Sequence, residues 1–265
     1  MMLFDGVDMS VQLFFLLFVR VFAMQQFAPL LSSGSIPGVA RIALALMSAS
    51  LVLPMVAATG YAIPDTGAAY AMLAVGEALI GIIMGFMLAI VFAAFQTAGQ
   101  FFSLQMGFGA SQVFDPLAQI EIPLLGQFLN IVAMLVFVFT AGFQKIFLSG
   151  VYLSFRSVRA IDLVLLREDI LVSMLRSLSG LFESALLVSF PILGTLLLVQ
   201  VVMGLLAKAA PQMNLLMLGF PISITVAFVM LLISIPFLMA SFDRIIDIGF
   251  ARLIEFFRGA AEVGL

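Results

Sequence analysis

The stretch ALIGIIMGFMLAIVFAAFQTAGQFFSLQMGFGASQVF, residues 78–114, contains no charged side chain. A helix needs about 20 apolar residues to cross a hydrocarbon core of roughly 30 Å, and this stretch exceeds that length. Similar charge-free runs occupy 42–64, 122–144, 184–207 and 209–242. The chain is 64% hydrophobic and 9% charged, whereas a soluble domain is nearer half apolar and a quarter charged. The sequence therefore predicts an all-α polytopic membrane protein.

Six apolar segments are expected, at 10–30, 38–58, 68–98, 124–148, 180–207 and 213–241. Segment 68–98 would be about 46 Å long as a helix, which is too long for one upright span. Three prolines interrupt the last two segments and are predicted to break or bend them, namely Pro191, Pro221 and Pro236. After the last segment, residues 243–265 place apolar side chains at helical spacing beside charged ones. This spacing predicts an amphipathic C-terminal tail.

The basic residues give an orientation. The connection 145–183 carries five Lys or Arg side chains and the tail carries three, whereas Arg41 and Lys208 are the basic residues near the opposite side. Because cytosolic loops of membrane proteins are enriched in Lys and Arg, both termini are expected to be cytosolic.

The composition also limits the chemistry. The chain has no His and no Cys, so Ser–His and Cys–His pairs and thiolate metal sites are impossible, and the acidic pairs lie in polar segments. We expect no enzyme activity, no cofactor and no metal. A net charge of −3 argues against nucleic acid as a partner.

Three charged residues, Arg20, Glu77 and Glu183, lie within or against apolar runs. A charge at the bilayer centre costs at least about 2.5–3.5 kcal/mol on insertion scales. Either these side chains reach the interface from helix ends, or they face protein or water within an assembly.

Small and amide side chains mark a second pattern. Gly81, Gly85, Ala89 and Ala93 repeat every four residues and form a small-residue stripe, which allows another helix to approach closely. The approaching helix could come from the same chain or from another chain. The glutamines from Gln96 to Gln127 could line a water-filled path or form hydrogen bonds between helices.

The connection SLQMGFGASQVFDPLAQIEIPLLGQ, residues 103–127, is unusually apolar and rich in glycine. Gly107 and Gly109 flank Phe108, and glycine permits positive φ and close backbone approach. Irregular backbone at membrane depth is tolerated where it is buried in protein or lines a cavity. Apolar side chains at a constriction exclude water and ions. Residues 106–114 therefore suit a removable hydrophobic seal, and a turn packed beneath its neighbours is the alternative.

The stretches QMGFGASQVFDPLAQIEIPLLGQFLN and GLLAKAAPQMNLLMLGFPISI resemble the FliR family of flagellar export-gate proteins and its injectisome counterpart SctT. The N-terminal pattern RVFAMQQFAPLLSSGSIPGVARIALALMSASLVLP is similar to that family too, and the likeness covers nearly the whole chain. Lys208 stands where the family more often has Arg. The matching motif after it consists of Pro211, Gln212, Met213 and Asn214.

The resemblance implies one FliR-like domain in a hetero-oligomeric export gate of the bacterial inner membrane, at a flagellar basal body or an injectisome base. In that family, tilted helical hairpins join FliP and FliQ, with FlhB as a further partner, around the path of unfolded export substrates. Residues 1–175, including loop 99–123, would be FliP-like, and residues 176–265 would form a FliQ-like hairpin with the tail. The family's plug loop corresponds to Met106, Gly107, Phe108, Gly109, Ala110, Val113 and Phe114. The alternative function is a secondary transporter or small-molecule channel, which broken helices would also suit.

Overall fold

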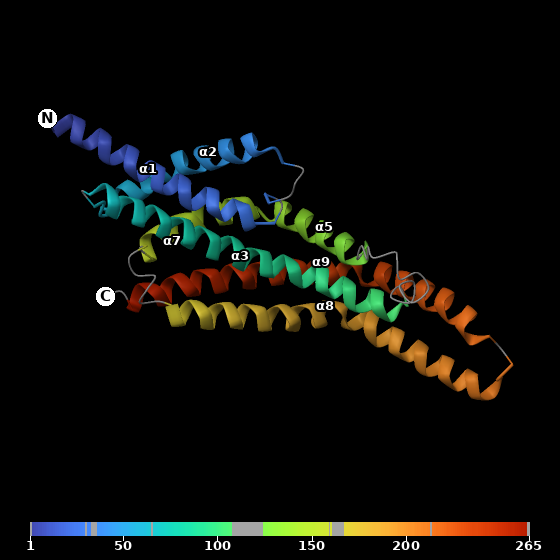
Figure 1. Cartoon of the computed structure of the whole chain (residues 1–265). Helices are drawn as coiled ribbons and strands as arrows, with labels where there is room; N and C mark the ends of the chain where they lie inside the picture. Colours follow the sequence, from blue (N-terminus) through green and yellow to red (C-terminus); the bar gives the residue numbers. More distant parts are fainter. Residues whose placement is uncertain are drawn as a thin grey trace. The chain divides into compact units, whose positions relative to one another are not determined.

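The computed structural model describes residues 2–29, 31–32, 36–64, 66–107, 124–158, 160, 167–212 and 214–263. These residues form helices and connections with no strand among them (Figure 1). The helices are α1 (Met2–Phe27), α2 (Gly38–Ala57), α3 (Gly67–Gln105), α5 (Leu124–Phe139), α6 (Gly142–Gln144), the π-helix η1 (Lys145–Gly150), α7 (Val151–Ser157), α8 (Arg167–Ala209) and α9 (Leu215–Val263).

Five of these helices, α1, α2, α3, α8 and α9, are long and apolar enough to cross a membrane. A sixth span exists if the bent pair Leu124–Phe139 and Gly142–Ser157 counts as one crossing. The prediction of an all-α polytopic membrane protein is confirmed.

The chain folds into two compact units that are interleaved in sequence. Unit 1 combines Met1–Val91, Phe137–Leu178 and Asp247–Leu265, and unit 2 combines Phe92–Val136 with Ser179–Ile246. Both units therefore draw on the N-terminal and the C-terminal halves of the chain.

In unit 1, glycines on α3 bring it against α1. A Cβ atom at Gly81 would overlap the carbonyl oxygen of Arg20, and a Cβ at Gly85 would overlap the carbonyl oxygen of Met24. The predicted stripe thus begins with packing inside the chain, while Ala89 and Ala93 farther along α3 are half-buried.

The C-terminal stretch also packs in unit 1. It is the continuous end of α9 rather than a separate tail, and its apolar side chains Phe250, Leu253 and Phe257 are buried. Gly249 allows close contact with Val91 of α3. Phe250 stacks on Phe137, with 6.3 Å between the ring centroids. The amphipathic pattern therefore describes a face that is covered by the chain itself.

In unit 2, α3 and α5 approach backbone to backbone. A Cβ at Gly99 would overlap the Cα of Gly126, and a Cβ at Gly126 would lie 2.6 Å from the carbonyl oxygen of Gln96. Gly99 therefore belongs to a helix crossing. The expectation of a loop beginning at residue 99 is wrong at its start, because α3 continues to Gln105.

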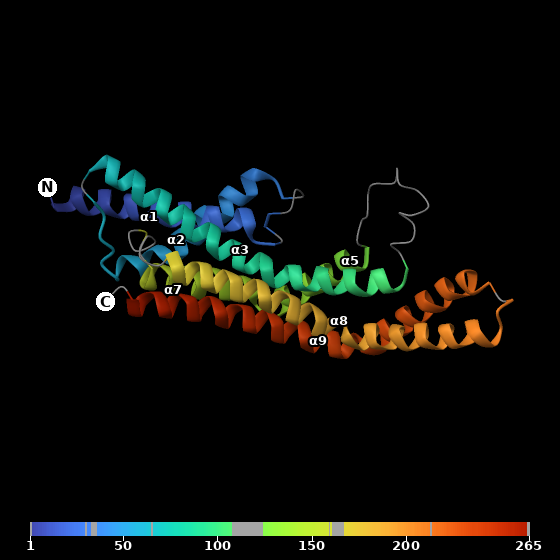
Figure 2. The ribbon, with the colours of Figure 1, turned by 60° about the horizontal axis from the view of Figure 1, so that its bottom comes forward.

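Also in unit 2, α8 and α9 lie side by side as an antiparallel hairpin in two views of the ribbon (Figures 1 and 2). Both helices continue through their prolines without a break. Hydroxyl groups one turn later donate to the proline carbonyls, Thr195 to Pro191 at 2.9 Å and Thr225 to Pro221 at 2.7 Å. Such bonds to the preceding turn accompany bending rather than termination of a helix.

The fourth apolar segment differs most from its prediction. Instead of one helix over 124–148, α5 ends at Phe139 and the chain turns at Ala141, which has a left-handed φ of 57°. The next residue is Gly142, where a Cβ would overlap the ring of Phe137. Hydropathy alone does not register this break, because both sides of it are apolar.

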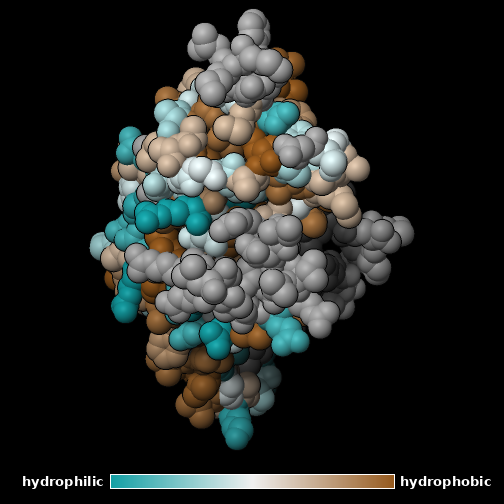
Figure 3. All heavy atoms as spheres, turned by 90° about the vertical axis from the view of Figure 1, so that its left-hand side faces the viewer, coloured by the Kyte–Doolittle hydropathy of each residue, from teal (hydrophilic) through white to brown (hydrophobic). Residues whose placement is uncertain are grey.

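Large apolar side chains remain at the surface of the described helices, and Figure 3 shows hydrophobic residues beside hydrophilic ones on one face. On the α8–α9 hairpin, Phe190 is 73% exposed and Met217 is 72% exposed. This surface requires lipid or another protein to cover it.

Candidate functional site

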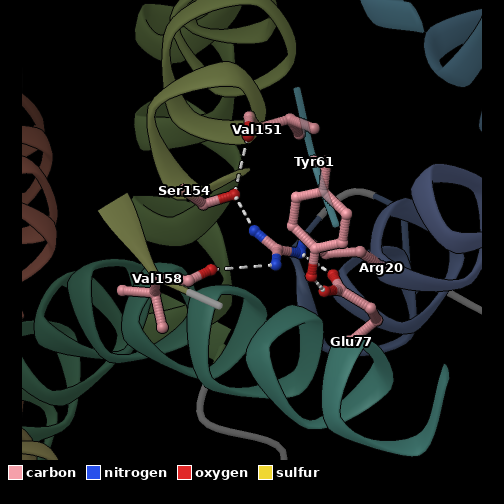
Figure 4. A network of polar contacts seen from close by, with 6 residues as sticks. All are labelled: Arg20, Tyr61, Glu77, Val151, Ser154 and Val158. Atoms are coloured by element: carbon pink, nitrogen blue, oxygen red, sulfur yellow. Dashed lines mark hydrogen bonds and ion pairs between the residues drawn. The ribbon is translucent and has the colours of Figure 1, made fainter. Parts of the chain in front are cut away.

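A buried network in unit 1 is centred on Arg20 of α1 (Figure 4). Its Nε donates to Glu77 Oε2 at 2.5 Å, Nη1 donates to Ser154 Oγ at 2.7 Å, and Nη2 donates to the carbonyl oxygen of Val158 at 3.3 Å. The guanidinium carbon lies 3.6 Å from the centroid of the Phe155 ring. Both charged side chains are fully buried. The network joins α1, α3 and α7, which are far apart in sequence.

Local packing explains how Glu77 reaches the guanidinium. Gly81 sets α3 against the backbone of Arg20. Glu77 precedes Gly81 by four residues and so lies on the same face of α3. Directly before Glu77, Gly76 packs on Ala160, and a Cβ added at Gly76 would lie 2.5 Å from the Ala160 Cβ. The glycines therefore hold α3 close to α1 and to the end of the α7 segment.

Tyr61, in the connection between α2 and α3, completes the network. Its hydroxyl donates to Glu77 Oε1 at 2.5 Å, and its ring meets Phe155 edge-on at 5.7 Å between centroids. Burial, together with the neighbouring Glu77 carboxylate, raises the pKa of the Tyr61 phenol well above its ordinary value of 10.0. The phenol therefore stays protonated and serves as a donor.

The sequence marked Arg20 and Glu77 as misplaced charges but gave no reason to pair them. The structure shows that both side chains face protein, which was one of the two alternatives. Glu183 is exposed. Tyr61 and Ser154 were missed, because nothing in their local sequence separates them from ordinary polar residues.

The predicted gate segment begins in unit 2 at the end of α3. Met106 is buried, and Gly107 has a φ of 90°. A Cβ at Gly107 would overlap the ring of Phe220 on α9. Just before it, Gln105 Nε2 donates to Gln200 Oε1 at 3.3 Å. Glycine at 107 is therefore required both by backbone conformation and by space.

The other predicted gate residues lie outside the described residues. They are Phe108, Gly109, Ala110, Val113 and Phe114.

The predicted motif at the tip of the hairpin has a partly structural explanation. Asn214 precedes α9, and its side-chain oxygen accepts a hydrogen bond from the backbone N–H of Met217 at 3.3 Å, which caps the helix. Lys208, Pro211 and Gln212 are exposed. Met213 lies outside the described residues.

The polar groups of the Arg20 network bond to one another. The three guanidinium nitrogens of Arg20 each donate to an oxygen, and Glu77 accepts from both Arg20 and Tyr61. Among the described residues, no group of three or more acidic side chains is placed to hold a metal ion.

Comparison with known proteins gives one consistent result. Residues 11–248 match the family model described as bacterial export proteins, family 1. The flagellar biosynthetic protein FliR of Borreliella burgdorferi is 32% identical over 91% of this chain and 88% of its own length. The proteins with that name from Bacillus subtilis and Escherichia coli are 31% and 29% identical, over 83% and 84% of this chain and 85% and 84% of their own lengths.

Proposed function

The chain belongs to the bacterial export proteins, family 1, and from this we propose that it is a core subunit of the flagellar protein export gate in the bacterial inner membrane. The similarity to proteins named FliR along more than four fifths of the chain carries this proposal. Because these relatives are flagellar, we favour a flagellar machine over an injectisome.

The lengths of the helices support a place within a larger assembly that contains FliP, FliQ and FlhB. At 1.5 Å per residue, α8 is about 65 Å long and α9 about 74 Å long. A hydrocarbon core is roughly 30 Å thick, and transmembrane helices seldom tilt beyond about 40°. Exposed apolar side chains extend along both helices. Lipid alone would leave part of this surface uncovered, so apolar faces of neighbouring subunits are the fitting complement.

The division into a FliP-like part, 1–175, and a FliQ-like hairpin, 176–265, belongs to the same proposal. The hairpin of α8 and α9 supports its second half. The packing of Phe250 on Phe137 ties the two halves together in unit 1, so the proposed likeness concerns the arrangement of helices rather than separate folding.

We propose that residues 106–114 seal the path through which unfolded substrates leave the cytosol. The buried Met106 and the tightly packed Gly107 give this segment a fixed base at the end of α3. A path left open would dissipate a membrane potential worth about 2.3 kcal/mol per charge per 100 mV. Apolar side chains close such a path without offering polar groups that would retain the substrate.

Deletion of residues 106–114 tests the seal. We expect cells carrying the deletion, or the milder replacement of Met106, Phe108 and Phe114 by Ser, to leak ions and small solutes while the complex still assembles. Gly109→Val is expected to slow export without a leak, because the segment loses conformational freedom. Gly67→Val is the matched control, since Gly67 has open space around it and lies outside the α8–α9 hairpin. A deletion that assembles, conducts nothing and exports normally would show that the segment is only a packed turn.

A further inference from the structure

We infer that the Arg20 network positions α7, the returning half of the bent pair, on α1 and α3, and that this positioning is its role rather than a net gain in stability. The observation behind this inference is the asymmetry of the contacts. One of the three guanidinium nitrogens donates to Glu77, and the other two donate to Ser154 in α7 and to Val158 directly after it.

The helical stretch that ends in α7 needs such a device. It runs without a break through α6, η1 and α7, Gly142–Ser157, and it begins after the turn at the left-handed Ala141. Because that turn separates it from α5, α5 does not set its direction. The buried side chains of α7 are Val151, Ser154 and Phe155.

Each hydrogen bond of the network has a defined donor and acceptor. Ser154 Oγ accepts from Arg20 and donates to the carbonyl oxygen of Val151 at 2.7 Å. The Phe155 ring lies against the guanidinium face and against the ring of Tyr61. The three nitrogens of the planar fork reach Glu77, a hydroxyl and a carbonyl separately. The three donors of a lysine ammonium share one nitrogen, so they do not match acceptors spread in this way. The fork therefore defines one place for α7.

Net stability is a weaker explanation for the ion pair. Removing two charges from water is costly, and replacing a buried pair by apolar residues is often neutral for stability. Removing one partner alone strands the other charge in the interior. Position and stability can therefore be separated by comparing single and double variants.

Cysteine accessibility tests the inference, because the chain contains no natural Cys. Val151→Cys reports on α7 and Ala45→Cys reports on α2, since both side chains are fully buried in unit 1. The full chain in native membranes is treated with a membrane-permeable maleimide, and the labelling rates are compared. The backgrounds are the natural pair, Arg20→Lys, Arg20→Met, and Arg20→Met combined with Glu77→Met.

In all three variant backgrounds we expect Val151→Cys to label about tenfold faster or more, while Ala45→Cys stays slow, because α7 loses the hydrogen bonds that hold it. We also expect the double variant to accumulate to higher levels than Arg20→Met alone. Unchanged labelling of Val151→Cys in Arg20→Lys would show that charge alone suffices and would overturn the role of the fork. Equal acceleration at both reporter positions would show that the network supports the whole unit instead of placing α7.

Discussion

At the scale of single residues, the unit 1 network shows how a charge is accommodated in an apolar interior. Arg20 is fully buried between an ion pair, two further acceptors and an aromatic face. A buried charge is costly when it is unpaired and tolerable when its donors are satisfied. The neighbouring Tyr61 contributes the last donor to Glu77, and its own ionisation is suppressed by burial and by that carboxylate.

Tyr61 gives the molecule a defined response to alkaline pH. The unfolded phenol ionises near 10.0 and the folded phenol at a higher pH. The associated stability is therefore complete below about pH 10 and is lost as the pH rises through the folded pKa. Tyr61→Phe removes the hydrogen bond to Glu77, and we expect the free energy of unfolding to fall by about 1–3 kcal/mol at neutral pH.

Thermal unfolding of the protein purified in complex with FliP and FliQ, at about pH 8 and about pH 11, measures both effects. Tyr152→Phe is the matched control, because Tyr152 lies outside the network. An alkaline loss of stability that is unchanged in Tyr61→Phe would contradict the assignment.

The sequence predicted that Arg20 and Glu77 are unusual, since charges inside apolar runs are rare. It did not predict their pairing, because 57 residues separate them and the packing at Gly81 decides which faces meet. Gly107 was correctly marked as a special position, and its φ of 90° agrees with the freedom expected of glycine. The contact with Phe220 depends on tertiary structure and has no local signature.

At the scale of elements, apolar runs predicted where the helices lie, and local geometry changed where they end. α3 continues through Gly99 to Gln105. The absence of a side chain at Gly99 lets α5 pack directly against the α3 backbone. The prolines at 191, 221 and 236 do not end α8 or α9. At 191 and 221 a threonine hydroxyl one turn later donates to the proline carbonyl. The break at Ala141 was missed, since no proline and no polar cluster accompanies it.

Because of that break, the 124–157 segment is either one broken crossing or a re-entrant loop. We expect it to cross, which gives six crossings with both termini cytosolic. Single Cys residues at the exposed positions Glu168, in the first turn of α8, and Gln212, just after its last turn, report on the two ends of this helix. We expect an impermeant maleimide to label Gln212→Cys from outside the cell, and Glu168→Cys only after the membrane is opened, as the basic connection 145–183 requires. The reverse pattern would mean that 124–157 re-enters the membrane without crossing it.

At the scale of the whole molecule, two features concern the proposed assembly. They are the interleaving of the two units in sequence and the exposed apolar surface. Unit 1 takes its last element from the C-terminus, where Lys145 pairs with Asp247 at 2.6 Å. The long helices of the hairpin remain apolar and exposed. These helices are much longer than a hydrocarbon core of roughly 30 Å. Lipid alone therefore leaves part of their apolar surface uncovered, and we expect neighbouring subunits to cover it.

Native mass spectrometry after co-expression tests this account most directly. The chain would be expressed with the FliP and FliQ proteins of the same genome, extracted in mild detergent and purified through a tag on this chain. We expect a defined hetero-oligomer that contains all three proteins, and we expect the chain expressed alone to be degraded or to aggregate. A stable, monodisperse monomer or homo-oligomer that excludes FliP and FliQ under both conditions would contradict the export-gate assignment.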